Sequence, residues 1–203
     1  DNDSTITDNA SIVMIGADNN SIFIVHDNAS FGLQGHVYHD NGTFQHSSIA
    51  GFTAIKSVDM CSVAVLDKMV VIVDNGTTTA NSAGFDVFTL EDNATFTTTA
   101  SNLTYSDNNS VAQLSDILAC DLTVTSDNST YILAIIENGG DNITVLSSDN
   151  LTGWNMNYMQ TLGFSSAKAK VSIAAPNGVE DVWVAVDDGT EMYLLHSDNG
   201  TSG

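Results

Sequence analysis

An internal repeat constrains this chain more than any other feature of its sequence. Each copy has an apolar run, a short polar turn, a second apolar run and then the sequence Asp-Asn-x-Ser/Thr. Because short apolar runs between turn residues are typical of β-strands, the repeat predicts one supersecondary unit used four times. The first apolar runs of the copies lie at residues 11–16, 69–73, 131–136 and 182–186.

The spacing of the copies predicts an all-β chain folded as a four-bladed β-propeller. They recur about every 50 to 60 residues, within the range of propeller blades. We expect one domain over residues 1–203, in which a strand at residues 5–7 completes the last blade and closes the ring. The alternative is that the chain forms part of a larger propeller or of a repeating fibre. The predicted repeats span approximately residues 4–54, 55–110, 111–163 and 164–203.

Individual strands follow from local composition. Residues 58–66 are apolar enough to predict a strand buried on both faces. Residues 95–100 are rich in Thr, which predicts an exposed outer strand. Residues 43–54 are interpreted as a crossing segment and residues 101–109 as a loop. Helical periodicity is limited to a weak pattern at residues 111–118. Trp183 lies in a middle strand and is expected in the core, whereas Trp154 begins an outer strand.

The turn before Trp154 carries a family resemblance. Residues Ser147-Ser148-Asp149-Asn150-Leu151-Thr152-Gly153-Trp154 resemble the Asp-box turn of sialidase-type β-propellers at the Ser, Asp and Trp positions. The sequence departs from that family at Leu151, where the family has Gly, and at Gly153, where it has Thr. The resemblance implies propeller architecture rather than sialidase chemistry, because in that family the Asp-box is a structural turn distant from the active site.

Charge excludes several partner classes. The chain has 25 acidic residues against four lysines and no arginine, which gives a net charge of -21. Nucleic acids and anionic membranes bind clustered Lys and Arg, so neither is expected as a partner. No apolar run reaches the length of a membrane-spanning helix, so we expect no membrane insertion. The chain begins at Asp1, and we interpret it as a mature chain or a piece of a longer one.

Glycosylation sequons give the strongest indication of compartment. Asn-x-Ser/Thr occurs at 13 of the 20 asparagines, and Asp precedes all but one of them. Turn chemistry explains the Asp-Asn pair but not the Ser or Thr that follows two positions later. We therefore predict a secreted or cell-surface glycoprotein that carries N-linked glycans and needs no cofactor, with calcium left open below. The predicted sites are Asn2, Asn9, Asn19, Asn28, Asn41, Asn75, Asn93, Asn102, Asn108, Asn128, Asn142, Asn150 and Asn199.

Cys61 and Cys120, the only cysteines, lie on the first strands of adjacent repeats. In an oxidising compartment they predict a disulfide between blades, and two buried free thiols are the alternative. Calcium at Asp-rich turns such as Asp187-Asp188-Gly189 stays open, although the spacing fits no known calcium loop.

Catalytic residues are harder to identify. Sialidase-like hydrolysis is excluded, because it needs arginines to hold a substrate carboxylate. Asp59, Asp116 and Asp121 begin inner strands and could form a carboxylate pair or a cation site, or simply be solvated acids at the rim. Among the histidines, His36 and His39 point to opposite faces of one strand, which argues against a metal shared with the nearby His46. His26 and His196 are expected to cover strand ends.

These observations favour a non-catalytic structural or adhesive module of a surface coat or extracellular fibre. Its partners would be further copies of itself or other surface proteins. Residues 43–73 and 156–198 contain no sequon and hold all four lysines, so we expect assembly contacts there. The alternative is a glycan-binding or glycoside-hydrolase-like propeller, with Trp or Tyr and paired acids at the mouth of the channel.

Glycosylation is tested by the intact mass of the native protein before and after enzymatic release of N-glycans. We expect a large loss of mass and one Asn-to-Asp conversion for each glycan released. An identical mass before and after the treatment would contradict the prediction.

Overall fold

Every regular element that the structure describes is a β-strand. The computed structural model describes residues 10–15, 21–28, 32–49, 60–74, 84–103, 105–107, 110–112, 117–137, 142–161, 170–177, 181–187 and 189–197. Within these ranges the strands form four sheets, and no helix long and apolar enough to cross a membrane is found there. The predicted all-β architecture is confirmed.

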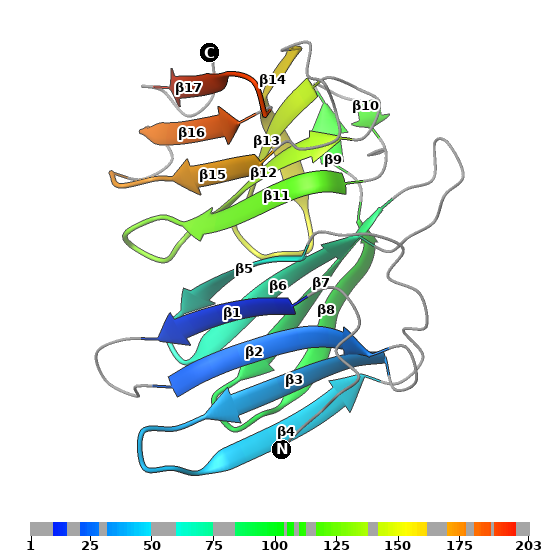
Figure 1. The fold of residues 1–203 in the computed structure, drawn as a ribbon. Coiled ribbons are helices and arrows are strands. Elements are labelled where there is room, and N and C mark those ends of the chain that lie inside the picture. The colour runs from blue at the N-terminus through cyan, green and yellow to red at the C-terminus, as the bar shows by residue number, and fades with distance from the viewer. Residues whose placement is uncertain are drawn as a thin grey trace.

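Each sheet contains a meander of consecutive antiparallel strands, and these meanders are here called blades 1 to 4 (Figure 1). Blade 1 contains β1 (Ala10–Ile15), β2 (Ser21–Asn28), β3 (Gly32–Tyr38) and β4 (Phe44–Ile49). Blade 2 contains β5 (Met60–Val65), β6 (Lys68–Asp74), β7 (Phe85–Glu91) and β8 (Phe96–Leu103). Blade 3 contains β11 (Ile117–Val124), β12 (Tyr131–Glu137), β13 (Asn142–Ser148) and β14 (Trp154–Thr161). Blade 4 contains β15 (Lys170–Ala174), β16 (Val182–Asp187) and β17 (Met192–Ser197).

Two short strands extend blade 3 at its outer edge. The first, β9 (Tyr105–Asp107), pairs in parallel with β14, and β10 (Ser110–Ala112) pairs with β9. The loop predicted at residues 101–109 is therefore wrong, because β8 continues to Leu103 and β9 follows. The weak helical pattern at residues 111–118 is also wrong where it is described, since its ends belong to β10 and β11.

The innermost strands pack in series. β1 contacts β5, β5 contacts β11, and β11 contacts β15, so the blades follow one another around a common axis (Figure 1). Among the described strands, β1 and β15 share no contact of this extent, and the four blades form an open arc. The strand predicted at residues 5–7 lies outside the described residues.

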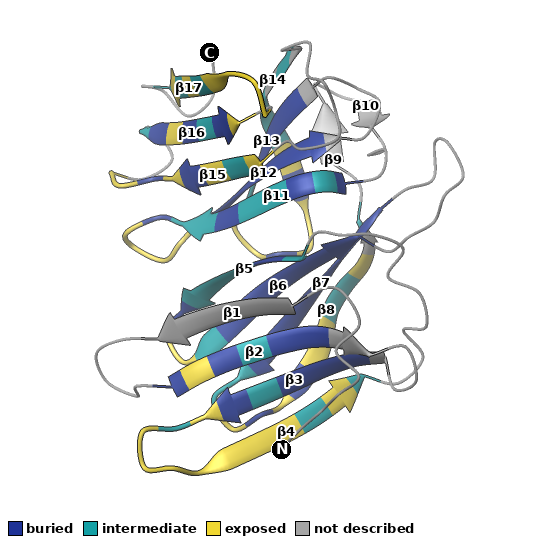
Figure 2. Ribbon diagram, in the orientation of Figure 1, coloured by how far each residue is buried: buried dark blue, intermediate teal, exposed yellow. Residues whose placement is uncertain are grey.

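Middle strands of the two inner blades are buried on both faces (Figure 2). Alternate side chains of a strand point to opposite faces, so each such strand contributes to two cores. On β12, Leu133 and Ile135 pack between blades 2 and 3, whereas Ile132 and Ile136 pack between blades 3 and 4. The strand β6 is divided in the same way between its neighbours. Each interface between blades is therefore a separate hydrophobic core.

Specific links join the blades near the axis. The disulfide Cys61–Cys120 connects β5 to β11. The buried carboxylate of Asp74 accepts a hydrogen bond from the backbone N–H of Ile117 at 2.9 Å, between blades 2 and 3. Asp121 accepts one from the N–H of Ile173 at 2.9 Å, between blades 3 and 4. Such charge-assisted bonds fix the register of one blade against the next.

Blades 1 and 4 differ from the inner blades, because each has one face that no described blade covers. On β16 burial alternates, and Trp183 on the outer face is 37% exposed. Trp154 is 2% exposed and packs edge-on against Phe85, with ring centroids 5.6 Å apart. The core position expected for Trp183 is therefore wrong, and Trp154 belongs to the core. The second face of β16 is covered by no described blade, and the sequence of the strand carries no sign of this.

Two further strand predictions need correction. Residues 58–66 do not form a doubly buried strand: β5 is mostly half-buried, and Leu66 is 68% exposed in the turn to β6 with a φ of 54°. The doubly buried strand of that hairpin is β6. The segment interpreted as a crossing contains β4, whose exposed and polar side chains lack the alternation typical of a strand.

We expect the disulfide to contribute measurably to the free energy of unfolding. Replacing Cys61 and Cys120 by Ser opens a loop with a sequence separation of 59 and should lower the free energy of unfolding by about 2–5 kcal/mol. Thermal or denaturant unfolding measures the change. Reductant should destabilise the wild type to the level of the double variant and leave the variant unchanged. An equal melting temperature for all samples would contradict the prediction.

Candidate functional site

The Asp-Asn turns place several predicted glycosylation sites at the surface. Asn41, Asn93, Asn128 and Asn150 are exposed. The side-chain oxygens of Asn41, Asn93 and Asn150 each accept a hydrogen bond from the backbone N–H two residues later, at 2.8, 2.9 and 3.0 Å. This Asx turn leaves the amide nitrogen, to which a glycan attaches, outside the bond. The other predicted sites are not described or have side chains that are not: Asn2, Asn9, Asn19, Asn28, Asn75, Asn102, Asn108, Asn142 and Asn199.

The Asp-box-like turn has a clear structural role. Leu151, at the position where the family has Gly, adopts a φ of 66°. Glycine enters this left-handed region without cost, whereas Leu is strained there. Ser148 Oγ accepts the N–H of Leu151 at 2.9 Å, and the indole N–H of Trp154 donates to the Leu151 carbonyl at 3.4 Å. The turn therefore seats Trp154 in the core and contributes no reactive group.

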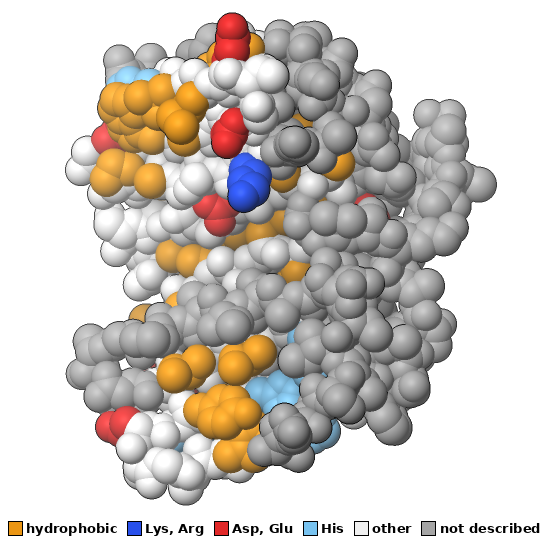
Figure 3. Space-filling view, viewed as in Figure 1, with side chains coloured by type: hydrophobic (Ala, Val, Ile, Leu, Met, Phe, Trp, Pro, Cys, Tyr) orange, Lys and Arg blue, Asp and Glu red, His pale blue; other side chains and the backbone are white. Residues whose placement is uncertain are grey.

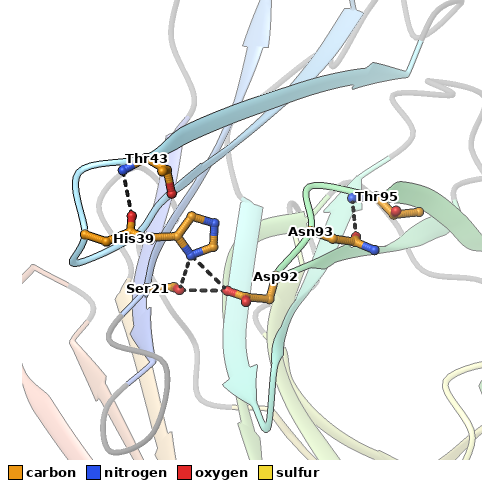
Figure 4. A network of polar contacts seen from close by, with 7 residues as sticks. Ser21, His39, Thr43, Asp92, Asn93 and Thr95 are labelled. Carbon is orange, nitrogen blue, oxygen red and sulfur yellow. Dashed lines mark hydrogen bonds and ion pairs between the residues drawn. The ribbon is translucent and has the colours of Figure 1, made fainter.

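A serine, a histidine and an aspartate meet between blades 1 and 2 (Figure 4). Ser21 Oγ donates to Asp92 Oδ1 at 2.7 Å and lies 3.0 Å from His39 Nδ1, and His39 Nδ1 lies 3.5 Å from the same carboxylate oxygen. A hydrolytic triad instead places serine and aspartate on different nitrogens of the imidazole. Ser21 is also fully buried. This cluster joins blade 1 to the turn between β7 and β8 and has no exposed nucleophile.

The predicted inner-strand carboxylates do not assemble into a described site. Asp121 uses one oxygen for Ile173 and the other for the N–H of Leu122 at 2.9 Å. Asp59, Asp116 and Asp188 lie outside the described residues. Asp187 accepts the N–H of Gly189 at 2.8 Å within its own turn. Within the described ranges, no group of three His, Cys, Asp or Glu residues is placed to hold a metal ion.

The histidines of blade 1 fall into two groups: His26, His36 and His46 lie together, and His39 lies apart from them. His39 lies beyond the end of β3 and points to Asp92, whereas His36 stacks on His26 with centroids 5.0 Å apart and lies beside His46. Phe44 stacks on the same imidazole at 5.6 Å. This outer face of blade 1 is aromatic. His26 lies near the end of the second strand of its blade, and His196 near the end of the third strand of its own.

An exposed aromatic platform lies on the outer face of blade 4. The indole of Trp183 stacks on the imidazole of His196, with centroids 3.8 Å apart and planes inclined by 19°. The two residues are direct cross-strand partners on β16 and β17. Asp181 Oδ1 contacts both rings at 2.8 Å, through Trp183 Nε1 and His196 Nε2. We name the group Trp183, His196 and Asp181 the blade 4 platform.

Hydrogen bonding sets the charge of the platform. The bond from His196 and, second, the bond from Asn177 Nδ2 at 2.5 Å hold the pKa of Asp181 below its ordinary value of 3.8. The carboxylate is therefore ionised at neutral pH. Because it fixes one edge of each ring, the indole is held in one orientation with 37% of Trp183 accessible to a ligand. A preorganised ring loses little conformational entropy on binding.

A cavity of about 300 Å³ lies between the outer strands of blades 3 and 4. Its walls come from β13 and β14 on one side and from β16 and β17 on the other. Most of the lining is aliphatic, and the polar groups come from Asn157, Tyr158, His196 and Ser197. No carboxylate lines it, so it lacks the acid pair of a glycosidase. The aliphatic lining is Val145, Val182, Val184, Leu194 and Leu195.

The comparisons with known proteins identify the fold. No family model matches the chain, and no curated protein matches it. Among solved structures, an exo-β-1,3-galactanase from Phanerochaete chrysosporium, bound to β-1,3-galactotriose, has a TM-score of 0.55 and 12% identity. That match covers 97% of this chain and 50% of the galactanase, so the chain spans half the galactanase's length.

Two other solved structures share this fold. A family 117 glycoside hydrolase from the marine bacterium Zobellia galactanivorans has a TM-score of 0.53 and 8% identity, with 96% of this chain and 67% of that chain covered. A GH43 enzyme from Xanthomonas citri, complexed with xylose, has a TM-score of 0.52 and 13% identity, with 91% and 68% covered. At these identities the likeness shows the fold alone, and that fold is a β-propeller, here with four blades.

The platform predicts a specific acid titration. Because the pKa of Asp181 is lowered, its bonds to the two rings should persist at neutral pH and break only as pH falls below about 3.8. The indole N–H resonance of Trp183 should shift in that range. Trp154, whose indole donates to a backbone carbonyl, is the internal control. An Asp181→Asn variant should remove this shift, and an equal shift of both indoles would contradict the prediction.

Proposed function

We propose that this protein is a carbohydrate-binding β-propeller module, and that the blade 4 platform contacts the sugar. The observation that carries the proposal is the flat, oriented Trp183–His196 stack on an exposed face. Sugars present one face of C–H groups that packs on an aromatic ring, and hydroxyls that accept or donate hydrogen bonds at its edge. The platform offers both, with Asp181 as an acceptor beside the ring.

Similar structures support a carbohydrate-related function without assigning a ligand. The galactanase and the GH43 enzyme hold β-1,3-galactotriose and xylose, and both share the propeller fold with this chain. A fold hosts many functions, so the proposal rests on the platform. A glycan-binding or glycoside-hydrolase-like propeller is the alternative considered above, and the comparisons favour it over the structural module.

We propose binding without hydrolysis. Glycoside hydrolysis uses two carboxylates on opposite sides of the scissile bond, one of them with a raised pKa. Asp181 has a lowered pKa and accepts bonds from His196, Asn177 and Trp183, so it is suited to orient rings rather than to donate a proton. The platform therefore supplies recognition only.

Replacing Trp183 by Ala tests the proposal. A glycan array of neutral oligosaccharides, followed by calorimetry with the best ligand, should show binding by the wild type. The variant should bind at least about tenfold more weakly, because buried Trp anchors carry a large share of binding energy. Tyr38→Ala is the matched control, since Tyr38 is 40% exposed on the outer face of blade 1.

Three outcomes would overturn the proposal. One is the absence of binding across the array by the wild type. Another is equal loss of affinity in the Trp183 and Tyr38 variants, which would place the ligand elsewhere. Hydrolysis of chromogenic glycosides by the wild type would contradict the non-catalytic part.

A second candidate function is the glycosylated surface module. The observation that favours it is the exposed Asx-turn geometry of Asn41, Asn93 and Asn150. The disulfide fits an oxidising compartment. We propose a secreted or cell-surface location on these grounds. Glycans at such turns would cover the loops and leave the faces of the terminal blades accessible, so the two functions are compatible.

A further inference from the structure

We propose that the sugar bound at the blade 4 platform carries a protonated amine, so that its ligands are oligosaccharides of amino sugars. This inference rests on the sugar site proposed above and adds a charge specificity to it. The ammonium group pairs with the carboxylate of Asp181 and lies over one face of the Trp183 indole. Three features lead to this assignment: the charge of Asp181, the groups that surround it, and the face of the indole that points toward β15.

The carboxylate of Asp181 has no lysine partner in the described part of the chain, where its one ion-pair contact is with His196. A neutral imidazole in its Nε2–H tautomer makes this contact without cancelling the charge of the carboxylate. Asn177 and Trp183 donate neutral N–H groups at 2.5 and 2.8 Å. A carboxylate has about four lone-pair sites, so these three bonds leave one site for a donor from a ligand.

The nearest lysine on this face is too distant to neutralise Asp181. Register places Lys170 and Asp187 directly opposite each other at the far end of the outer face of blade 4. A strand rises by about 3.3 Å per residue, so this pair lies roughly 15 Å from Asp181. That separation exceeds the Debye length of about 8 Å at physiological ionic strength, so solvent ions screen Lys170 from Asp181. An ammonium group on the ligand offsets the charge instead.

The Trp183 indole supplies the second contact for the cation. One face of the ring stacks on His196 of β17, so its other face points toward β15. Its cross-strand partner there is Ala174, an exposed residue with only a methyl side chain. Trp183 is 37% exposed, and hydrophobic side chains gather over β16 and β17 on the face shown in Figure 3. A cation within about 6 Å of the centre of an indole is attracted by the face of the ring.

The groups around Asp181 favour an ammonium over a metal ion. Its described neighbours present N–H groups toward it, whereas a divalent cation needs several oxygen ligands. An amino sugar brings a C–H face for the ring together with ammonium N–H donors for the carboxylate. The net charge of -21 attracts such a ligand and repels sugars that carry carboxylates or sulfates.

Calorimetry with matched tetrasaccharides tests the charge specificity. The cationic probes are the tetramer of glucosamine and an aminated cellotetraose in which primary amines replace the primary hydroxyls. N-acetylation of each gives its neutral counterpart. The wild type should bind at least one cationic probe about fivefold or more tightly than its counterpart, as expected for an ion pair and a cation–π contact at an exposed site. Added salt should reduce this ratio, because it screens the ion pair.

Two variants locate the charge that is responsible. Asp181→Asn removes the charge and keeps the size of the side chain, so the preference for the cationic probe should disappear. Asp187→Asn is the matched control, because it removes the same charge from the far end of the same face. It should change the ratio of affinities less than about twofold, since that charge is screened from the platform. Asp181→Glu should retain the preference.

The outcomes separate this inference from the sugar site on which it rests. Absence of binding to every probe would overturn the sugar site together with its charge specificity. Equal affinity for cationic and neutral probes would leave the sugar site in place and overturn the charge specificity, as would a preference that survives Asp181→Asn or is lost equally in Asp187→Asn. Competition by an oligolysine of matched charge, as strong as that by the cationic tetramer, would show attraction of cations without sugar recognition and would also overturn it.

Discussion

Burial of both faces of the middle strands is the constraint on which the rest of this structure depends. An isolated four-stranded sheet cannot cover its own apolar side chains. The alternating side chains of β6 and β12 enter two different cores, and each fully buried Val or Ile contributes about 1.5–3 kcal/mol. The blades therefore stabilise one another in series rather than folding as separate units. Close approach is part of this packing, because a Cβ at Gly35 would lie only 3.0 Å from Leu90 of the next blade.

Blades 1 and 4, at the two ends of the described series, differ from blades 2 and 3. Blades 1 and 4 each have one face that packs on a neighbouring blade and one that no described blade covers. The second face of each holds exposed aromatic residues, namely Tyr38, Phe44 and Trp183. Polar links such as Asp74 with Ile117 orient the inner blades. The exposed aromatic groups are thus concentrated on blades 1 and 4, and the proposed sugar contact at the blade 4 platform follows from that position.

Local sequence predicted the strands well where periodicity and turns agreed. The apolar runs at residues 131–136 and 182–186 lie within β12 and β16, and the turn at Asp149 precedes Trp154 as its pattern indicates. The exchange of roles between Trp154 and Trp183 could not be predicted, because it depends on which blade is terminal. The contact of Ser21 with Asp92 spans 71 residues and has no local signal. The positive φ of Leu66 could not be predicted, because the apolar run of the strand continues into the turn.

Native-state hydrogen exchange, resolved by strand and measured in dilute solution, tests the central claim most directly. Strands buried on both faces by neighbouring blades should open only with global unfolding, whereas strands at an uncovered edge should exchange through local opening. We expect the highest protection in β6 and β12 and the lowest in β4 and β17. Uniform protection across all four sheets, or protection of β17 equal to that of β12 in the monomer, would contradict an arc stabilised by its inner blades.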